Sequence, residues 1–547
     1  MRPICPVLTF GALLCCLPAC VEEPPVDDDD DDSAVADDDD SAVADDDDSG
    51  GDDDDSAALD STRYVVLAPD SLAEAAEAFA DYREGRGLPS EVILRSHLEA
   101  TTEAELRTAL VERLAEIAAP LPSDRPLLLL LLGDAPGPDE DALDPDLIPA
   151  LPCTSSLGPC YTDNRYGDLD GDLVPDVAVG RVPARTVEQA LAYLDRVRSF
   201  ESDYRTGLWN RRLFIYAGAS GFGDTYDGLA ESLAFETLSR GGHSFDLLAA
   251  WDNPTSVYSY EPFDDKVLEL FEDGAFAGMY IGHGSAANTD GLSVDQLETM
   301  SCENRSPFLF LFACLNGNYA EATDSLAERV LWSAGGPIAA FAGNGTTHPY
   351  ANAVLPYEAH RALTGHLPAT FGEVALRTKQ QLITNDDEIR DLARGYAVFL
   401  GVEEEELPVV EMEHLDQYNL FGDPAIATSY PRTVIDFDPV AGEVSEGSLA
   451  VAGEAPGLGA GTAWVTLEIA PTEYLVELDP EPEDAAAIAA RWQAANDKVV
   501  VGVEVPLVDG RFEATLLFDP DLPGDDLFVK VYADDGEADS FGHVVAP

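Results

Sequence analysis

Short apolar runs alternate with stretches of helical apolar spacing between residues 64 and 342, and this alternation limits the available folds more than any other feature. Strands that alternate with helices form a mainly parallel sheet covered by helices. The runs predict strands at 64–68, 91–94, 127–132, 177–181, 213–217, 245–249, 278–281, 308–313 and 337–342, and helices at 72–82, 103–118, 187–200, 228–239 and 324–333. We divide them into two α/β subdomains, residues 61–208 and 209–431, each with its own mostly parallel sheet.

The pattern changes after residue 431, where the apolar residues begin to alternate over short stretches. Strands are expected at 463–469, 499–505, 512–518 and 527–532. Several short alternating strands predict a β-sandwich over residues 432–547, interrupted by one helical insert at 485–495. A chain of 547 residues is long enough for several compact units of this kind.

The first residues have the pattern of an export signal. A short apolar run leads to Leu17-Pro18-Ala19-Cys20, which resembles the bacterial lipobox, where the signal is cut and the cysteine is lipidated. Residues 1–19 are therefore predicted to be a lipoprotein signal peptide, and a lipidated Cys20 would hold the exported chain on a bacterial membrane, at the outer membrane or cell surface. An ordinary cleaved signal with an incidental cysteine is the alternative.

Residues 20–60 consist of Asp blocks separated by small residues, with no basic side chain. Such a segment cannot form a core and repels itself, which predicts a disordered tether, with weak binding of many calcium ions as the alternative. The whole chain has 105 acidic against 30 basic residues and a formal net charge of −75. Binding to nucleic acid needs clustered Lys and Arg, so this balance argues against a nucleic-acid partner.

The cysteines beyond the signal separate into a local pair and two others. In an exported protein, Cys153 and Cys160 predict a small disulfide loop, with a metal pair as the less favoured interpretation because no further Cys or His lies nearby. Cys302 and Cys314 remain, and only Cys314 lies in a recognisable motif.

His283 and Cys314 each follow directly after an expected strand. A thiol attacks best as a thiolate, and a nearby imidazole can take its proton and later give one to a leaving amine. The amides of Gly284 and Cys314 could bind the oxyanion of the tetrahedral intermediate. Taken singly, a buried core histidine and a small buried cysteine are the ordinary interpretations, but the pair favours a Cys-His mechanism.

Motifs around this pair carry a resemblance to a known family. They are Leu130-Leu-Leu-Gly-Asp134, Asp168-Leu-Asp-Gly-Asp172, Pro175-Asp-Val-Ala-Val-Gly-Arg181, Gly282-His-Gly-Ser285, Ala313-Cys-Leu-Asn-Gly317 and Phe421-Gly-Asp-Pro424. In this order they resemble the gingipain family of cysteine peptidases, within the caspase-like fold group. The resemblance implies two α/β subdomains, the second catalytic, followed by an immunoglobulin-like sandwich.

The resemblance also implies a substrate pocket. Trypsin-like members bind a basic P1 side chain with an aspartate early in the helix after the first strand of the catalytic subdomain, and Asp227 falls there. A simple helix-starting role for Asp227 is the alternative. The family places an acidic residue beside the catalytic histidine, and the loop at residues 218–223 is shorter here without a clear counterpart.

Two further segments suggest binding sites. Asp168, Asp170, Asp172 and Asp176 place carboxylates at alternate positions around a glycine turn, which predicts a structural calcium ion, with a solvated acidic turn as the alternative. Residues 343–349 follow the strand after Cys314, and we expect them to form a pocket wall with His348 and Tyr350 near the substrate.

The leading hypothesis is a lipid-anchored cysteine endopeptidase that acts on proteins or peptides and needs no catalytic cofactor. A pocket role for Asp227 would favour cleavage after Arg or Lys. One alternative is an inactive surface binding or adhesion lipoprotein that keeps the peptidase fold. Another is a maturation peptidase or transpeptidase that acts on exported proteins.

Overall fold

A computed structural model of the chain describes residues 63–547, apart from 123–124, 138–139, 141–143, 203–204, 220–234, 236–237, 366, 400, 432 and 525. The signal peptide, Cys20, the tether and Asp227 lie outside the described residues. None of the helices that are described is both long and apolar enough to cross a membrane.

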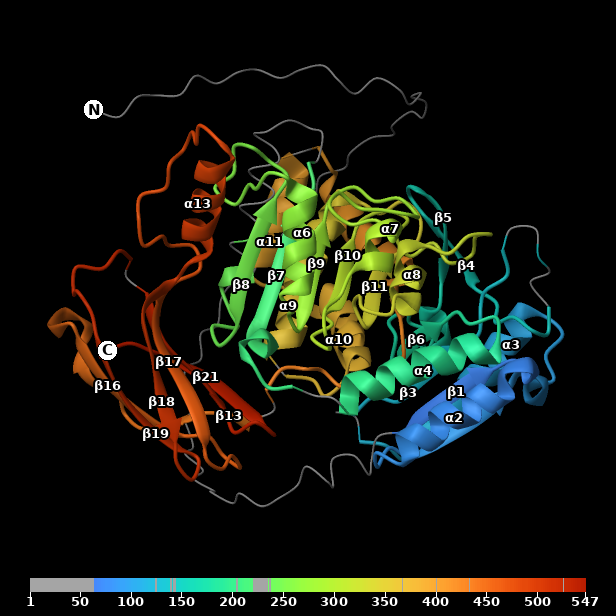
Figure 1. The fold of residues 1–547 in the computed structure, drawn as a ribbon. Helices are drawn as coiled ribbons and strands as arrows, with labels where there is room; N and C mark the ends of the chain where they lie inside the picture. Colours follow the sequence, from blue (N-terminus) through green and yellow to red (C-terminus); the bar gives the residue numbers. More distant parts are fainter. Residues whose placement is uncertain are drawn as a thin grey trace, which may run out of the picture. The chain divides into compact units, whose positions relative to one another are not determined.

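A ten-stranded sheet runs through the α/β part of the molecule (Figure 1). Its strands are β1 (Tyr64–Ala68), β2 (Ser90–Leu94), β3 (Leu128–Leu132), β6 (Ala178–Val182), β7 (Arg212–Ala217), β8 (Asp246–Trp251), β9 (Ala277–Ile281), β10 (Phe308–Phe312), β11 (Ala339–Gly343) and β12 (Tyr418–Phe421). They lie in the order β2-β1-β3-β6-β12-β11-β10-β9-β7-β8. Neighbouring strands are parallel except β11 and β12.

The prediction of two separate sheets is wrong, because β12 joins them into one. This strand lies antiparallel to β11 and parallel to β6. It is short, and its partners are distant in the sequence, so no local pattern could show that it closes the gap between the two series of strands. The predicted strands themselves match the described ones to within one or two residues.

Helices lie on both sides of the sheet (Figure 1). They are α2 (Ala73–Glu84), α3 (Glu103–Ala118), α4 (Val187–Ser202), α6 (Phe263–Glu272), α7 (Val294–Thr299), α8 (Leu326–Trp332), α9 (Pro349–Gly365), α10 (Phe371–Thr384), α11 (Glu388–Phe399) and α12 (Leu407–Gln417). On β1, Val66 packs in one core with Phe79 of α2, and Val65 packs in another with Leu110 of α3. Burial on both faces explains why this strand is continuously apolar.

The C-terminal part has two sheets that share a separate core. One has the order β13-β21-β20-β17-β18, and in the other β16 pairs with β14, β15 and β19. The strands are β13 (Thr433–Val434), β14 (Asp436–Phe437), β15 (Ala441–Glu443), β16 (Ser448–Glu454), β17 (Gly461–Ile469), β18 (Val499–Leu507), β19 (Arg511–Leu517), β20 (Leu527–Asp534) and β21 (Asp539–Val545). Val451 and Phe512 of one sheet pack in this core with Val465 and Val529 of the other. The immunoglobulin-like assignment stays a prediction.

The helical insert α13 (Ala485–Asn496) packs against β8, the last strand of the ten-stranded sheet (Figure 1). The Nε1–H of Trp492 donates to the carbonyl oxygen of Ala249, and the Ala249 amide donates to Oδ1 of Asn496, both over 2.8 Å. Side chains of α13 therefore satisfy backbone groups that an edge strand would otherwise leave unpaired.

Candidate active site

His283 and Cys314 lie at the same edge of the sheet, at the carboxyl ends of neighbouring strands. Strands β9 and β10 are parallel, and Ile281 is paired with Phe312. His283 and Cys314 each come two residues after this pair. Adjacent strands lie about 4.8 Å apart, so the register places the two residues side by side on neighbouring loops. Cys314 is partly buried and His283 is exposed.

The two loops are joined by Asn316, whose side chain is fully buried. Its Nδ2 donates to the carbonyl oxygens of Ser285 at 2.7 Å and Asn288 at 3.2 Å. A Cβ atom at Gly284 would lie 2.4 Å from the carbonyl oxygen of Cys314. Only glycine at position 284 allows the loops to approach so closely.

The loop that carries His283 is also held by the side chain of Tyr280. The hydroxyl of Tyr280 donates to the carbonyl oxygen of His283 over 2.7 Å, and the amide of Asp290 donates to the same hydroxyl oxygen over 3.3 Å. Burial, followed by the charge of Asp290, raises the pKa of Tyr280, so this phenol keeps its proton. The backbone beside His283 is therefore fixed from within the chain.

The sulfur of Cys314 faces Thr347 in the loop after β11. The Thr347 amide nitrogen lies 3.4 Å from Sγ, its Oγ1 lies 3.5 Å away, and its carbonyl oxygen lies 3.8 Å away. All three are within the range of hydrogen bonds to sulfur. The sequence analysis assigned this segment to a pocket wall but did not select Thr347.

His348 and Tyr350 are both engaged at the start of α9. The amide of Tyr350 donates to Nδ1 of His348 over 3.1 Å, and the amide of His348 donates to Nε2 of His414 over 2.9 Å. Burial lowers the pKa of His348, which favours its neutral form. The hydroxyl of Tyr350 donates to Glu411 over 2.5 Å. These contacts belong to the packing of α9 and α12, and a role in substrate binding stays a prediction.

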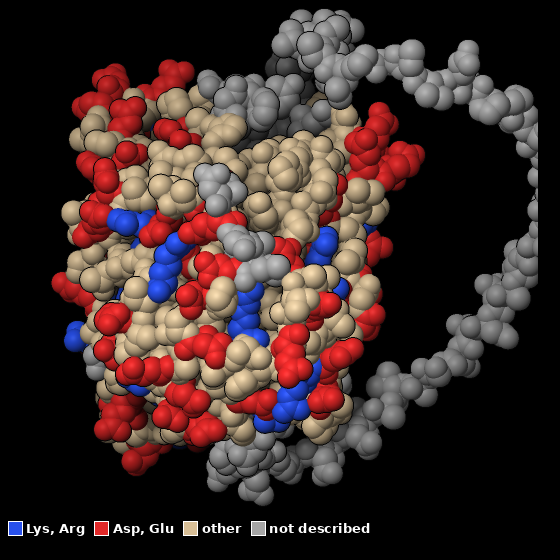
Figure 2. Space-filling model, turned by 90° about the vertical axis from the view of Figure 1, so that its right-hand side faces the viewer, with Lys and Arg blue, Asp and Glu red and all other residues tan. Residues whose placement is uncertain are grey.

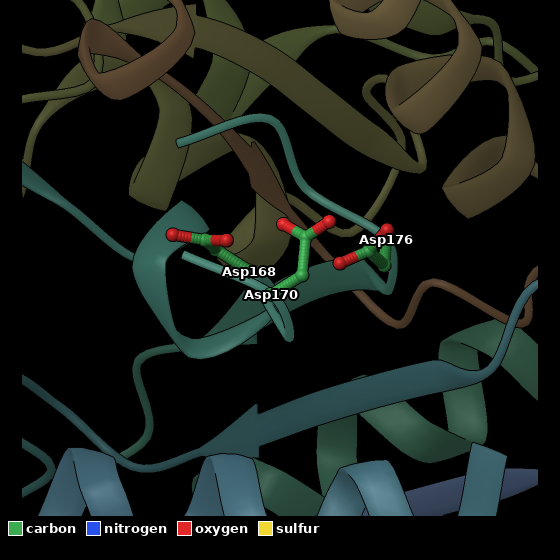
Figure 3. Close-up of side chains that lie close together, drawn as sticks. All are labelled: Asp168, Asp170 and Asp176. Carbon is green, nitrogen blue, oxygen red and sulfur yellow. The ribbon is translucent and has the colours of Figure 1, made fainter. Parts of the chain in front are cut away.

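Three of the four predicted metal ligands come together (Figure 3). One carboxylate oxygen from each of Asp168, Asp170 and Asp176 lies within 4.8 Å of the others. Burial and the neighbouring aspartates raise the pKa of Asp176. The structure places Asp172 outside this group, and its Oδ1 accepts a hydrogen bond of 2.8 Å from the amide of Val174. Its carboxylate therefore closes a turn within its own loop.

Cys153 and Cys160 form a disulfide between two short paired strands, β4 (Leu151–Ser155) and β5 (Gly158–Thr162). The turn of this hairpin lies against α12, where Ser156 Oγ donates to Glu413 over 2.8 Å. A Cβ at Gly345, in the loop that contains Thr347, would lie 3.4 Å from the Cβ of Cys160. The disulfide hairpin therefore packs beside the loop that faces Cys314.

The acidic composition is visible on the surface. In Figure 2, Asp and Glu side chains far outnumber Lys and Arg on the face shown. Some of the basic side chains form buried ion pairs and do not reach the surface. Arg83 pairs with Asp423 and Glu201, and Arg181 pairs with Asp163.

The model of peptidase family C25 matches residues 57–429, which include both catalytic candidates. The chain belongs to peptidase family C25. The predicted membership of the gingipain family is thereby confirmed. The match covers more than half of the chain and includes every strand of the ten-stranded sheet.

Individual relatives are distant. Gingipain R2 of Porphyromonas gingivalis (strain ATCC BAA-308 / W83) is 23% identical over 278 residues, which cover 50% of this chain and 34% of that protein. Gingipain R1 of Porphyromonas gingivalis is 24% identical over 176 residues, covering 31% and 17%. The chain thus spans about a third of the length of gingipain R2 and 17% of the length of gingipain R1.

Among solved structures, the crystal structure of the Arg-specific cysteine proteinase gingipain R is similar with a TM-score of 0.51 and 18% identity. The match covers 89% of this chain and 98% of that one. A second structure, described as a protease, has a TM-score of 0.52 and 13% identity, covering 89% and 97%. These likenesses support the mixed α/β fold with a mostly parallel central sheet.

Proposed function

We propose that this C25-family chain is a cysteine endopeptidase in which Cys314 is the nucleophile and His283 the proton-transfer group. The observation that carries the proposal is the β9–β10 register, which brings both residues to one edge of the sheet on loops joined by Asn316. Family membership supplies the reaction class.

The proposed reaction begins when His283 takes the thiol proton and the sulfur of Cys314 attacks the carbonyl carbon of the scissile peptide bond. The carbonyl oxygen becomes an oxyanion, for which the amides of Gly284 and Cys314 are the proposed donors. His283 then protonates the leaving amine, and the C–N bond breaks to give an acyl-enzyme. Water, activated by the same histidine, releases the acid and restores the thiol.

The test uses the full-length chain and a peptide library that includes Arg and Lys at P1. Cys314→Ser should lower kcat/KM by at least about a thousandfold, because the hydroxyl is a far poorer nucleophile in a site built for a thiol. The matched control is Cys302→Ser at a buried position away from the site. Cleavage that survives Cys314→Ser unchanged, or a folded wild type inactive on the whole library, would overturn the proposal and favour the non-catalytic binding protein.

Specificity and product outcome are separate parts of the proposal. Asp227 is proposed to hold a basic P1 side chain, so Asp227→Asn should reduce cleavage after Arg and Lys more than after other residues. Equal losses on all substrates would assign Asp227 a structural role.

Products formed in the presence of added amines distinguish transpeptidation from hydrolysis.

We also propose that the chain is exported and lipidated at Cys20, on the strength of Leu17-Pro18-Ala19-Cys20. The Cys20→Ala variant should move from the membrane fraction to the soluble fraction of a bacterial host. A protein distributed identically with and without this cysteine would contradict lipidation.

A structural calcium ion is proposed at Asp168, Asp170 and Asp176. Oxygen ligands of calcium lie 2.3–2.6 Å from the ion, so oxygens within 4.8 Å of one another fit a shared ion. Asp168 is 1% exposed, and its Oδ2 has no hydrogen-bond donor in the described part of the chain, although Arg107 lies 3.6 Å away. Burial, followed by the charges of the neighbouring aspartates, raises the pKa of Asp176, and a bound calcium ion would favour its charged form.

Removing calcium with a chelator should lower the melting temperature by about 3 °C relative to the protein at saturating calcium, and Asp168→Asn should abolish this difference. Asp172→Asn is the matched control, since this residue lies outside the group. A wild-type melting temperature that is the same with and without calcium would exclude the site.

A further inference from the structure

Thr347 presents three polar groups to the sulfur of Cys314. It follows β11, is 3% exposed, and presents an amide nitrogen 3.4 Å and a hydroxyl oxygen 3.5 Å from Sγ. Two donors aimed at one sulfur stabilise a thiolate more than a thiol, because the charged form accepts the stronger hydrogen bonds.

The hydroxyl of Thr347 is held in place by a hydrogen-bond chain of two more buried side chains. The hydroxyl of Tyr418 donates to Oδ1 of Asn352 over 2.7 Å, and Nδ2 of Asn352 donates to Oγ1 of Thr347 over 2.8 Å. Tyr418 is 0% and Asn352 8% exposed. Because Oγ1 already accepts from Asn352, its own hydrogen is available for donation, and Sγ of Cys314 lies 3.5 Å away.

Backbone packing holds the threonine in this orientation. A Cβ atom at Gly343 would lie 2.9 Å from Cγ2 of Thr347, so the glycine leaves room for the methyl group. Tyr418 is paired with Gly343 across the antiparallel β11–β12 contact. The strand that joins the two halves of the sheet thus also supplies the far end of the hydrogen-bond chain.

We propose that Thr347 is a catalytic residue that stabilises the thiolate of Cys314, and that Asn352 and Tyr418 are positioning residues that orient its hydroxyl. In the thiol form the S–H group faces the Thr347 carbonyl oxygen, 3.8 Å away. When the proton leaves, the amide and hydroxyl of the same residue become donors to sulfur. The catalytic role of these hydrogen bonds rests on the proposed function, but their effect on the thiol of Cys314 does not.

The test is the pH dependence of Cys314 alkylation by iodoacetamide in the full-length protein, followed by mass spectrometry of the modified peptide. Thr347→Val removes the hydroxyl and keeps nearly the same shape. It should move the midpoint of the pH–rate profile upward by about one pH unit, the effect of one hydrogen bond to a charged group. Thr347→Ser restores the hydroxyl and should return the midpoint to within about 0.3 units of wild type.

The neighbouring Thr346→Val is the matched control, because this exposed side chain should leave the profile unchanged. Asn352→Leu should raise the midpoint by a smaller amount, and it replaces Thr347→Val as the deciding variant if the latter does not fold. A Thr347→Val or Asn352→Leu profile that coincides with wild type would overturn the proposal. If the shifts occur but the folded wild type cleaves no peptide of the library, the peptidase proposal fails while the role of Thr347 in stabilising the thiolate stands.

Discussion

Strand β10 has a cysteine beyond each of its ends, and the two differ in almost every respect. Cys302 precedes the strand, is 0% exposed, and has its pKa raised to about 12 by burial. Cys314 follows the strand, is partly buried, and has the amide and hydroxyl of Thr347 directed at its sulfur. The same residue type is closed off at one edge of the sheet and surrounded by polar partners at the other.

The polar groups near each end serve opposite purposes. On the side of Cys302, the guanidinium of Arg196 donates to the carbonyl oxygens of Val330, Leu331, Gly336 and Pro337 at 2.5–3.2 Å, which closes the end of α8. On the side of Cys314, Asn316 joins two loops, one of which carries the exposed His283. The comparison teaches that this sheet uses polar side chains for packing at its amino edge and for holding reactive groups at its carboxyl edge.

The largest expected difference between the two edges is chemical. At pH 7.5, Cys314 should be alkylated by iodoacetamide at least about a thousandfold faster than Cys302, since a buried thiol with a pKa of about 12 is almost entirely protonated. Quantitative mass spectrometry of the two cysteine peptides measures both rates in one sample. Comparable rates in the folded protein would remove the contrast between the edges.

The next effect concerns the packing role of the amino edge. Arg196→Met should lower the free energy of unfolding by about 3 kcal/mol, because it leaves several buried carbonyl groups without donors. Denaturant titration measures the loss.

Arg198→Met on the same helix is the control. Arg198 is 42% exposed and forms a surface ion pair with Asp195, so less than about 1 kcal/mol is expected. The rate of Cys314 alkylation should be unchanged in Arg196→Met. Equal losses from the two variants would mean that the carbonyl contacts of Arg196 add no stability beyond a surface ion pair. Slower alkylation of Cys314 in Arg196→Met would mean that the two edges are not independent.

The smallest effect is a pH dependence of stability caused by Cys302. The folded protein raises the pKa of this thiol to about 12, so the unfolded chain releases the proton at lower pH. The stabilisation is therefore complete below pH about 8.5 and is lost as pH rises toward 12, with a slope of about 1.4 kcal/mol per pH unit.

Comparison with Cys302→Ala isolates this term. Between pH 8 and pH 10 the wild type should lose about 2 kcal/mol more than the variant, as measured by chemical unfolding at each pH. Parallel losses in both proteins would show that Cys302 does not retain its proton in the folded state.

Much of the fold followed from local patterns. The apolar runs gave the strands to within one or two residues, and the strand at 127–132 was evident because six consecutive leucines can only be buried on both faces. The helix at 103–118 was also identified, with Thr102 capping it through the Glu105 amide. The prediction failed at β12, whose four residues carry no sign of the two strands between which they lie.

The sequence predicted the reactive residues of the candidate site but not the residues that hold them in place. His283 and Cys314 could be selected because each follows a strand, and parallel strands bring their carboxyl ends to one edge. Thr347, Asn352 and Tyr418 could not be selected, because their value lies in distances across three separate segments. Asn316 was inside a recognised motif, but its contacts with Ser285 and Asn288 are set by the fold.

The sequence by itself determined the alternating apolar runs, the positions of a histidine and a cysteine at strand ends, and the Asp-rich segment at residues 20–60. Its motifs also indicated the peptidase family. Hydrophobic periodicity and motif spacing are local, so they can be read along the chain. Only the tertiary structure decided that one sheet replaces two, and that Thr347 supplies polar groups to the sulfur of Cys314. Both outcomes depend on which distant strands pair and which groups are buried, and these are properties of the packed chain.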